Sequence, residues 1–263
     1  MNQSLLGKTA LVTGSTSGLG KGIADTLAAS GCHIVLNGFG DPAEIEAIQA
    51  DLQTRYGVEA IHHGANLTQP TEIAGLFEHA FARFGTVDIL VNNAGMQHVS
   101  PIEDFPHEKW DTILALNLSA AFHCAKAVLP GMRQRQWGRI INIASAHGLV
   151  ASPFKSAYVA AKHGLVGLTK VIALETARDH ITCNAICPGY VHTKIVEGQI
   201  DEQAKVTGLP REHVVEEVIL SKHPNKKFVE VEQVAALVSF LCSDAGSSMT
   251  GTALPMDGGW TAI

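Results

Sequence analysis

The sequence lacks an excess of positive charge, a long apolar run and a secretion signal. Its 263 residues carry 19 Lys and Arg against 25 Asp and Glu, a formal net charge of −6 at pH 7. Without a basic stripe there is no electrostatic reason to expect a nucleic acid as partner. No apolar run approaches the ~20 residues that cross a bilayer, so no membrane partner is expected. The first residues show no charged region before an apolar one and no cleavage signal, which argues against secretion.

The sequence also lacks a cysteine pattern typical of a disulfide framework. Its five cysteines are odd in number and irregularly spaced: Cys32, Cys124, Cys183, Cys187 and Cys242. Cys183 and Cys187 share a face of an expected strand, but no second pair completes a zinc site. We therefore predict no metal, and buried thiols in a cytoplasmic protein.

Short β-branched runs alternate with amphipathic stretches along the whole chain. Hydrophobic residues make up 46% and charged residues 17%, which allows a sizeable core and argues against disorder. We expect strands near residues 9–14, 33–38, 59–66, 87–95, 138–145, 181–189 and 252–259, and helices that begin near residues 18, 42, 70, 107, 156 and 231. Continuous apolar strands between helices predict a parallel sheet covered on both faces. Because no linker or repeat divides the chain, residues 1–263 are expected to form one doubly wound α/β domain.

Residues 192–228 are more charged than their surroundings and follow the sixth expected strand. Ligands of open α/β sheets bind beyond the carboxyl ends of the strands. An insertion at this edge is positioned to cover a ligand as a lid. The same composition also fits a solvated helical segment that covers nothing.

The first expected strand runs into a glycine-rich turn, "VTGSTSGLGKGIA", with Gly14, Gly18 and Gly20. Glycines allow the backbone to approach a pyrophosphate, whose charge the following helix N-terminus meets. The spacing differs from G-x-G-x-x-G, and a glycine-rich turn can be merely tight. Its position after the first strand favours a dinucleotide, with Thr16, Ser17 and Leu19 beside it.

The end of the second expected strand reads Asn37, Gly38, Phe39, Gly40 and Asp41. An NADP-binding protein usually has Arg or Lys here, to pair with the 2′-phosphate. Neither is present, so NAD is the predicted cofactor, with Phe39 near the adenosine.

Further cofactor contacts are expected where later strands end. Asn66 and Leu67 could flank the adenine or simply form a turn, and "NNAG" could line the cofactor path or tie strands together through asparagine hydrogen bonds. The expected contacts at these strand ends are Asn66, Leu67, Asn93, Ala94, Gly95, Pro188, Gly189 and Val191.

Candidate catalytic residues gather around one strand and the helix after it. Ser145 ends the fifth expected strand, while Tyr158 and Lys162 lie one helical turn apart. A nearby ammonium lowers a tyrosine pKa, which suits proton exchange with an alcohol or ketone. Asn117, on an apolar helix, could help a proton relay to Lys162 or be a satisfied interior amide.

Together these motifs resemble the short-chain dehydrogenase/reductase family over nearly the whole chain. The resemblance rests on "TGSTSGLG", "NNAG", Asn117, Ser145 and the Tyr158–Lys162 pair. It implies a Rossmann fold, a nicotinamide cofactor and a catalytic tetrad of Asn117, Ser145, Tyr158 and Lys162. It also implies that Tyr158 and Lys162 contact the cofactor.

Lys155 precedes Tyr158 by three residues. It could pair with a substrate carboxylate, or it could be a solvated loop charge. The segments "NNAGMQH", "IASAHGLVASPFKSAYVAAKHG", "TCNAICPG" and "DGGW" resemble the branch of the family that oxidises D-3-hydroxybutyrate to acetoacetate with NAD. That resemblance implies a homotetramer and a pocket for this small hydroxy or keto acid, formed by Gln97, His147, Lys155, Tyr190, Gln199 and Trp260.

The chain departs from that branch at two positions, since Tyr190 replaces a common Trp and Asn66 a common acidic residue. A 3-oxoacyl-thioester reductase and a non-catalytic dinucleotide sensor remain alternatives. Lys155 and the missing cation after the second strand count against the first, and the complete tetrad counts against the second.

Overall fold

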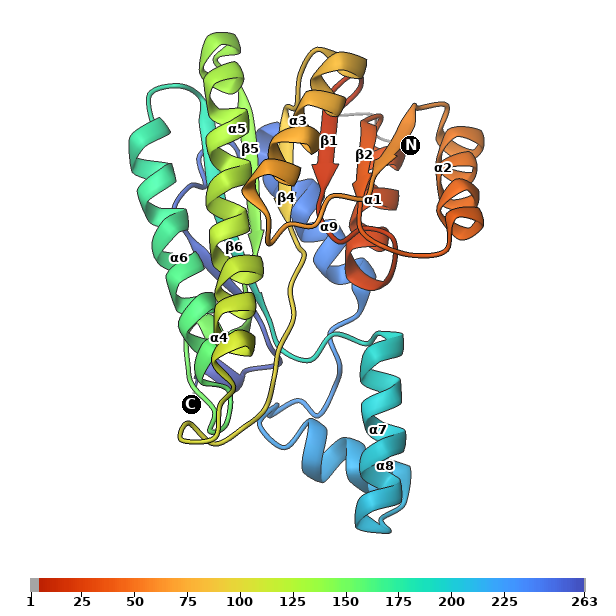
Figure 1. The fold of residues 1–263 in the computed structure, drawn as a ribbon, viewed down its shortest axis with the longest axis vertical. Helices are drawn as coiled ribbons and strands as arrows, with labels where there is room; N and C mark the ends of the chain where they lie inside the picture. Colours follow the sequence, from red (N-terminus) through yellow and green to blue (C-terminus); the bar gives the residue numbers. More distant parts are fainter. Residues whose placement is uncertain (1–4, 263) are drawn as a thin grey trace.

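A seven-stranded parallel sheet forms the centre of the molecule (Figure 1). The structure, a computed structural model, describes residues 5–262, except for the side chains at positions 194, 195, 199, 202, 203, 206 and 207. The strands are β1 (Thr9–Val12), β2 (His33–Asn37), β3 (Ala60–His63), β4 (Ile89–Asn92), β5 (Gly138–Ile143), β6 (Ile181–Pro188) and β7 (Ala253–Met256). Their order, β3-β2-β1-β4-β5-β6-β7, is that of a Rossmann sheet. The predicted fold class and all seven strands are confirmed.

Helices connect the strands in the predicted alternation. They are α1 (Gly18–Ala29), α2 (Pro42–Tyr56), α3 (Pro70–Phe84), α4 (His107–Leu114), α5 (Ala120–Arg135), α6 (Ser156–Thr176), α7 (Lys194–Thr207), α8 (Arg211–His213) and α9 (Val231–Cys242). A π-helical turn, η1 (Ala115–Ser119), joins α4 to α5, and a second, η3 (Val214–Ile219), follows α8. All six predicted helix starts coincide with observed ones.

Local sequence explains several helix boundaries. Asp41 caps α2 by accepting hydrogen bonds from the backbone N–H groups of Ala43 and Glu44. Pro42 and Pro70 stand in the first turns of α2 and α3, where a missing N–H costs nothing. These two helices end at Gly57 and Gly85, which adopt the left-handed conformation that stops a helix.

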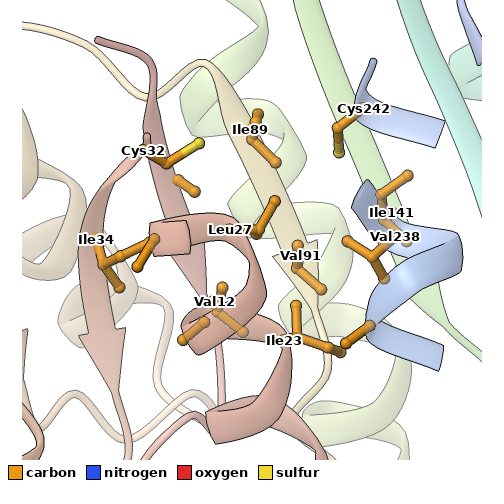
Figure 2. Packing of buried hydrophobic residues seen from close by; sticks show 14 of the residues in the cluster. Val12, Ile23, Leu27, Cys32, Ile34, Ile89, Val91, Ile141, Val238 and Cys242 are labelled. Atoms are coloured by element: carbon orange, nitrogen blue, oxygen red, sulfur yellow. The ribbon is translucent and has the colours of Figure 1, made fainter. Parts of the chain in front are cut away.

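Both faces of the sheet are apolar, so the core has two halves. On β1, Val12 packs on the side of α1 and α9, whereas Leu11 packs on the side of α3 and α5. Figure 2 shows the first half, where Ile23 and Leu27 of α1 and Val238 of α9 meet the strand side chains. Alternate strand residues point to opposite faces, which is why a doubly covered strand is continuously hydrophobic. All five cysteines are buried and free, as predicted.

The segment between β6 and α9 lies beyond the carboxyl ends of the strands. It contains α7, α8 and η3, which Figure 1 shows apart from the sheet at its lower end. Its own small apolar cluster includes Ile200, Val214 and Leu220. The segment therefore has the position that the sequence predicted for residues 192–228.

Two helical segments, His107–Arg135 and Ser156–Thr176, have the length and hydropathy of a membrane span. Their most apolar windows are 39% and 44% buried within the fold. Packing against the sheet and against each other accounts for this apolar character, because core helices meet the same criterion.

The turn after β1 tolerates no side chain at position 20. A Cβ there would lie 2.2 Å from the carbonyl oxygen of Gly14, well inside van der Waals contact. Gly20→Ala should therefore displace the turn, lower the free energy of unfolding by roughly 1–3 kcal/mol and weaken dinucleotide binding by about tenfold or more. Urea unfolding and calorimetric titration with NADH measure the two effects.

Gly75→Ala in α3 is the matched control, because open space surrounds that position. It should raise the free energy of unfolding by about 0.5–1 kcal/mol and leave cofactor affinity unchanged. Unaltered stability and affinity in Gly20→Ala would contradict the steric argument.

Candidate active site

One cavity of about 520 Å³ opens at the carboxyl edge of the sheet. This volume is within the range of small-molecule sites. It joins the glycine turn, the ends of β4, β5 and β6, helix α6, the start of α7 and the carboxyl-terminal turn. The lining residues are Leu19, Asn93, Gly95, Met96, Gln97, Ile143, Ala144, Ser145, His147, Lys155, Tyr158, Lys162, Pro188, Gly189, Tyr190, Val191, Thr193, Val196 and Trp260. The cavity thus brings predicted cofactor, catalytic and substrate residues together.

The turn from β1 to α1 has the features of an anion cradle. Gly14 and Gly18 adopt positive φ angles of 63° and 52°. Ser17, at the helix N-cap, makes no side-chain hydrogen bond, and the first turn of α1 contains no acidic residue. The exposed N–H groups and the positive end of the helix dipole therefore suit a pyrophosphate. These residues fit a dinucleotide.

The loop after β2 is held by backbone-directed hydrogen bonds. The Asn37 amide donates to the carbonyl oxygens of His63 and Ala65, and the Thr16 hydroxyl donates to that of Phe39 at 2.8 Å. The Phe39 side chain is 70% exposed. Asp41 is engaged as the cap of α2. The loop from 37 to 41 thus offers neither a cation for a 2′-phosphate nor a free carboxylate for a ribose.

The residues after β3 serve mainly to build a turn. The Asn66 side-chain oxygen accepts hydrogen bonds from the N–H and the hydroxyl of Thr68. Leu67 is buried among residues of α3 and α5 and does not line the cavity. The predicted adenine contact of Leu67 stays a prediction.

Asn93 fixes the path between β1 and β4. Its amide donates to the carbonyl oxygens of Thr13 and Gly14, at 2.9 and 3.1 Å. A Cβ on Gly14 would lie 3.0 Å from the Cα of Ala94, so the two loops are in close contact. The predicted tying role of "NNAG" is confirmed.

Ser145, Tyr158 and Lys162 meet where β5 ends and α6 begins. The Ser145 side chain is close enough to the Tyr158 hydroxyl to lower its pKa against the larger effect of burial. Lys162 is 4% exposed, lies 5.6 Å from the centroid of the Tyr158 ring, and donates to the Ile143 carbonyl oxygen at 2.7 Å. The geometry presents a serine and a tyrosine hydroxyl to the cavity beside a buried ammonium.

Burial governs the proton affinities of this pair. It lowers the pKa of Lys162 to about 8. It raises the pKa of Tyr158, against an opposing effect of the Ser145 side chain. The prediction of a lowered Tyr158 pKa is therefore wrong for the free protein, because desolvation of the phenolate outweighs the lowering effect of Ser145.

Asn117 has a positioning role in this structure. Its amide nitrogen donates to the Met96 carbonyl oxygen at 2.8 Å, and its oxygen accepts the Met96 N–H at 2.9 Å. Both ends are thus used by one backbone unit. A Cβ on Gly95 would lie 3.3 Å from the Asn117 oxygen and 3.7 Å from Lys162 Nζ, so the fixed segment borders both residues. The alternative of a satisfied interior amide therefore describes the Asn117 side chain in this structure, and its help in a relay to Lys162 stays a prediction.

The far end of the cavity is aromatic and positively charged. His147 packs edge-on against Trp260 at 4.9 Å, and Tyr190 stacks on Trp260 at 6.4 Å. Lys155 Nζ lies 5.9 Å from the Tyr190 centroid. Burial and the Lys222 charge lower the pKa of Lys155. No carboxylate is among the described residues that line the cavity.

The remaining predicted substrate residues have different outcomes. Gln97 lines the cavity, as predicted. Gln199 lies in α7, and its side chain is outside the described residues. Two histidines close in sequence to cavity residues, His98 and His192, do not line the cavity. His98 packs against Phe105, and His192 pairs with Glu197.

Sequence reasoning missed three residues around the cavity. Ser152 bonds His147 Nε2 at 2.9 Å, and Lys222 Nζ donates to Ser152 at 2.9 Å. The fully buried His223 accepts the Tyr190 N–H at 3.3 Å and packs against Trp260. The one sequence signal for Lys222 and His223 is the high charge of residues 192–228, the segment that contains them.

Comparisons with known proteins agree with this geometry. The family model described as enoyl-(acyl carrier protein) reductase matches residues 14–261. The D-beta-hydroxybutyrate dehydrogenases of Rhizobium meliloti and Cupriavidus necator are 56% and 53% identical to the chain, over 97% and 98% of its length and 99% of theirs. The solved structure of L-sorbose reductase from Gluconobacter frateurii, complexed with NADPH and L-sorbose, is similar with a TM-score of 0.94, at 31% identity and full coverage of both chains.

A dinucleotide turn joined in one cavity to a serine, a tyrosine and a buried lysine defines an oxidoreductase that uses a nicotinamide cofactor, NAD or NADP. The chain belongs to the short-chain dehydrogenase/reductase family.

The buried Lys162 should lower stability near neutral pH. Its folded pKa of about 8 is below the ordinary lysine value of 10.5, so the unfolded chain binds more protons between these two pH values. Lys162→Met should raise the free energy of unfolding at pH 7 by about 1–2 kcal/mol, because relief of about 3 kcal/mol of desolvation is offset by the lost hydrogen bond. The gain should shrink as the pH rises from 8 toward 10.5, although activity is lost throughout.

Urea unfolding of both proteins at pH 7 and pH 9.5 measures this difference. Lys170→Met, on the exposed side of α6, is the control and should have a small effect at both pH values. A destabilised Lys162→Met protein at pH 7 would show that the buried ammonium stabilises the fold.

Proposed function

We propose that the protein catalyses the reversible oxidation of D-3-hydroxybutyrate to acetoacetate, with NAD as hydride acceptor. The main supporting observation is the charge of the cavity. Lys155, three residues before Tyr158, reaches the cavity, and the described residues that line the cavity include no carboxylate. An acid substrate would supply the missing negative charge. The two dehydrogenases of similar sequence act on this acid by name.

The substrate half of the cavity suits a short acid. Lys155 would pair with the carboxylate, while Gln97, His147 and Gln199 add hydrogen bonds. Tyr190 and Trp260 would close the apolar side. A 3-oxoacyl thioester has no carboxylate at the matching position, so this charge gives a thioester reductase no advantage.

In the proposed mechanism Tyr158 takes the hydroxyl proton as the carbon–hydrogen bond breaks. The glycine turn with Gly14, Gly18 and Gly20 would hold NAD⁺, which would supply the hydride acceptor for the carbinol carbon and a positive charge that favours the Tyr158 phenolate. Ser145 holds the reacting oxygen, Lys162 stabilises the phenolate, and Asn117 keeps the Met96 segment in place. In the reverse direction Tyr158 returns the proton to the ketone. Because burial raises the Tyr158 pKa, oxidation should accelerate with rising pH and reduction with falling pH.

NAD is proposed over NADP because the loop from 37 to 41 contains neither Arg nor Lys. A phosphate dianion there would have no cation to pair with. The L-sorbose reductase structure contains NADPH, so the family fold alone does not select the cofactor.

We further propose a cytoplasmic homotetramer whose subunit is one domain, with residues 192–228 as a lid. Exposed apolar side chains on α5 and α6, namely Phe122, Val171 and Leu174, support contacts between subunits. The free cysteines suit a reducing compartment. Light scattering tests the proposed mass.

Initial rates of NADH formation with D- and L-3-hydroxybutyrate, repeated with NADP, test the proposed function. Turnover is expected with the D acid and NAD, and the rate should fall at least about tenfold with NADP or the L acid. Faster reduction of 3-oxoacyl thioesters than of acetoacetate would replace this function with a thioester reductase.

Lys155→Met should separate acid recognition from cofactor binding. Loss of the ammonium should raise the KM for 3-hydroxybutyrate by about 10–100-fold while the Kd for NADH changes less than about twofold. Tyr158→Phe is the companion variant and should abolish turnover with little effect on either ligand. Equal losses of acid and cofactor affinity in Lys155→Met would exclude the carboxylate role.

A further inference from the structure

A chain of polar side chains connects the protein surface with the reacting groups. It begins at the exposed Lys222, whose Nζ lies 2.9 Å from Ser152 Oγ, and continues from Ser152 to His147 Nε2, also at 2.9 Å. On the other side of the ring, His147 Nδ1 lies 3.5 Å from Ser145 Oγ. Ser145 in turn acts on the Tyr158 hydroxyl, since its side chain lowers the Tyr158 pKa against the larger effect of burial. Three side chains, those of Ser152, His147 and Ser145, therefore connect Lys222 with the tyrosine hydroxyl.

The donor and acceptor capacities give this chain a direction. An ammonium only donates, so Ser152 Oγ must accept from Lys222. The Ser152 hydroxyl then has one proton to donate, and among the described residues the recorded partner that can accept it is His147 Nε2. A hydroxyl polarised by an ammonium is also the stronger donor. These conditions favour the His147 tautomer with its proton on Nδ1.

The tautomer decides the direction of the Ser145 proton. Ser145 Oγ already accepts the backbone N–H of His147 at 3.2 Å. With Nδ1 protonated, Ser145 accepts from the ring too, and its own proton is left for the Tyr158 oxygen or the substrate oxygen. With the other tautomer, Ser145 would donate to Nδ1 and turn its proton away from the reacting atoms.

The surroundings of His147 keep the ring neutral, so that the choice of tautomer matters. Burial, followed by the charges of Lys155 and Lys222 and by His163, lowers the pKa of His147 to about 4. The rings of Tyr158 and Trp260 cover it edge-on. No carboxylate contacts His147 in the described part of the chain.

We propose that Lys222 is a positioning residue which, through Ser152, holds His147 as the Nδ1–H tautomer and so directs the Ser145 proton to the reacting oxygen. The inference deepens the proposed function and rests on it only for the nature of that oxygen.

Nitrogen NMR of the ¹⁵N-histidine-labelled protein tests the tautomer without any substrate. The His147 signals are assigned by their loss in His147→Gln. The expected result is a protonated Nδ1 and an unprotonated Nε2 in the native protein at pH 7.5. In Lys222→Met the two nitrogens should move toward the averaged shifts of a tautomer mixture, and in Lys222→Arg they should keep the native shifts.

Steady-state kinetics gives the second readout. Lys222→Met and Ser152→Ala should each lower kcat by about three- to tenfold, the effect of one hydrogen bond, with NADH affinity unchanged. The double variant should lose no more than either single variant, because both act through one chain. Lys227→Met is the matched control, since this exposed lysine of the same turn has no recorded side-chain bond to Ser152.

A protonated Nε2 in the native protein, or native shifts retained in Lys222→Met, would overturn the proposal. Additive losses in the double variant would also do so, as would an equal loss in Lys227→Met. Failure of the proposed function is distinguishable, because the NMR result is independent of which alcohol is oxidised.

Discussion

The hydrogen bond from Lys162 to the Ile143 carbonyl is the interaction on which the site depends. It joins the middle of α6 to the last residue of β5 at 2.7 Å. Ser145 follows that strand end by two residues, and Tyr158 precedes Lys162 by one helical turn, so this bond sets the two hydroxyls opposite each other. Because the ammonium is almost completely buried, the bond also supplies the polar partner that makes such burial tolerable.

The second constraint is the positive charge of the cavity. Lys155, Lys162 and Lys222 surround its substrate half, and burial or repulsion lowers the pKa of the first two. In the proposed function a substrate carboxylate and the cofactor pyrophosphate would supply compensating anions at opposite ends. Burial first, and then the charges of Lys155 and Lys222, lower the pKa of His147 to about 4 and so keep the ring neutral. The same lysines therefore bear on both the proposed substrate class and the proposed proton positioning.

Much of the architecture could be predicted from the sequence because it is encoded in local patterns. The strand runs, the glycine turn and the spacing between Tyr158 and Lys162 each act over a few residues. The direction of the Tyr158 pKa shift could not be predicted, because it depends on how far burial outweighs the lowering effect of Ser145. The hydrogen bonds between the Asn117 amide and the Met96 backbone could not be predicted either, because they join residues 21 positions apart. Lys222 and Ser152 are separated by 70 positions, and only the folded chain brings them together.

The turn from residue 221 to residue 227 connects the outer helical segment with three walls of the cavity. Lys222 donates a hydrogen bond to Ser152. The adjacent His223 accepts a hydrogen bond from the Tyr190 backbone N–H and packs against the Trp260 ring. On the other side, Asp257 accepts hydrogen bonds from the backbone N–H groups of Gly259 and Thr261, the two residues that flank Trp260. Burial alone would raise the pKa of Asp257, but these hydrogen bonds lower it. If residues 192–228 act as the proposed lid, a movement that opens the cavity would stretch the hydrogen bond from Lys222 to Ser152. On that proposal, substrate access and the orientation of the Ser145 proton would be coupled through this one bond.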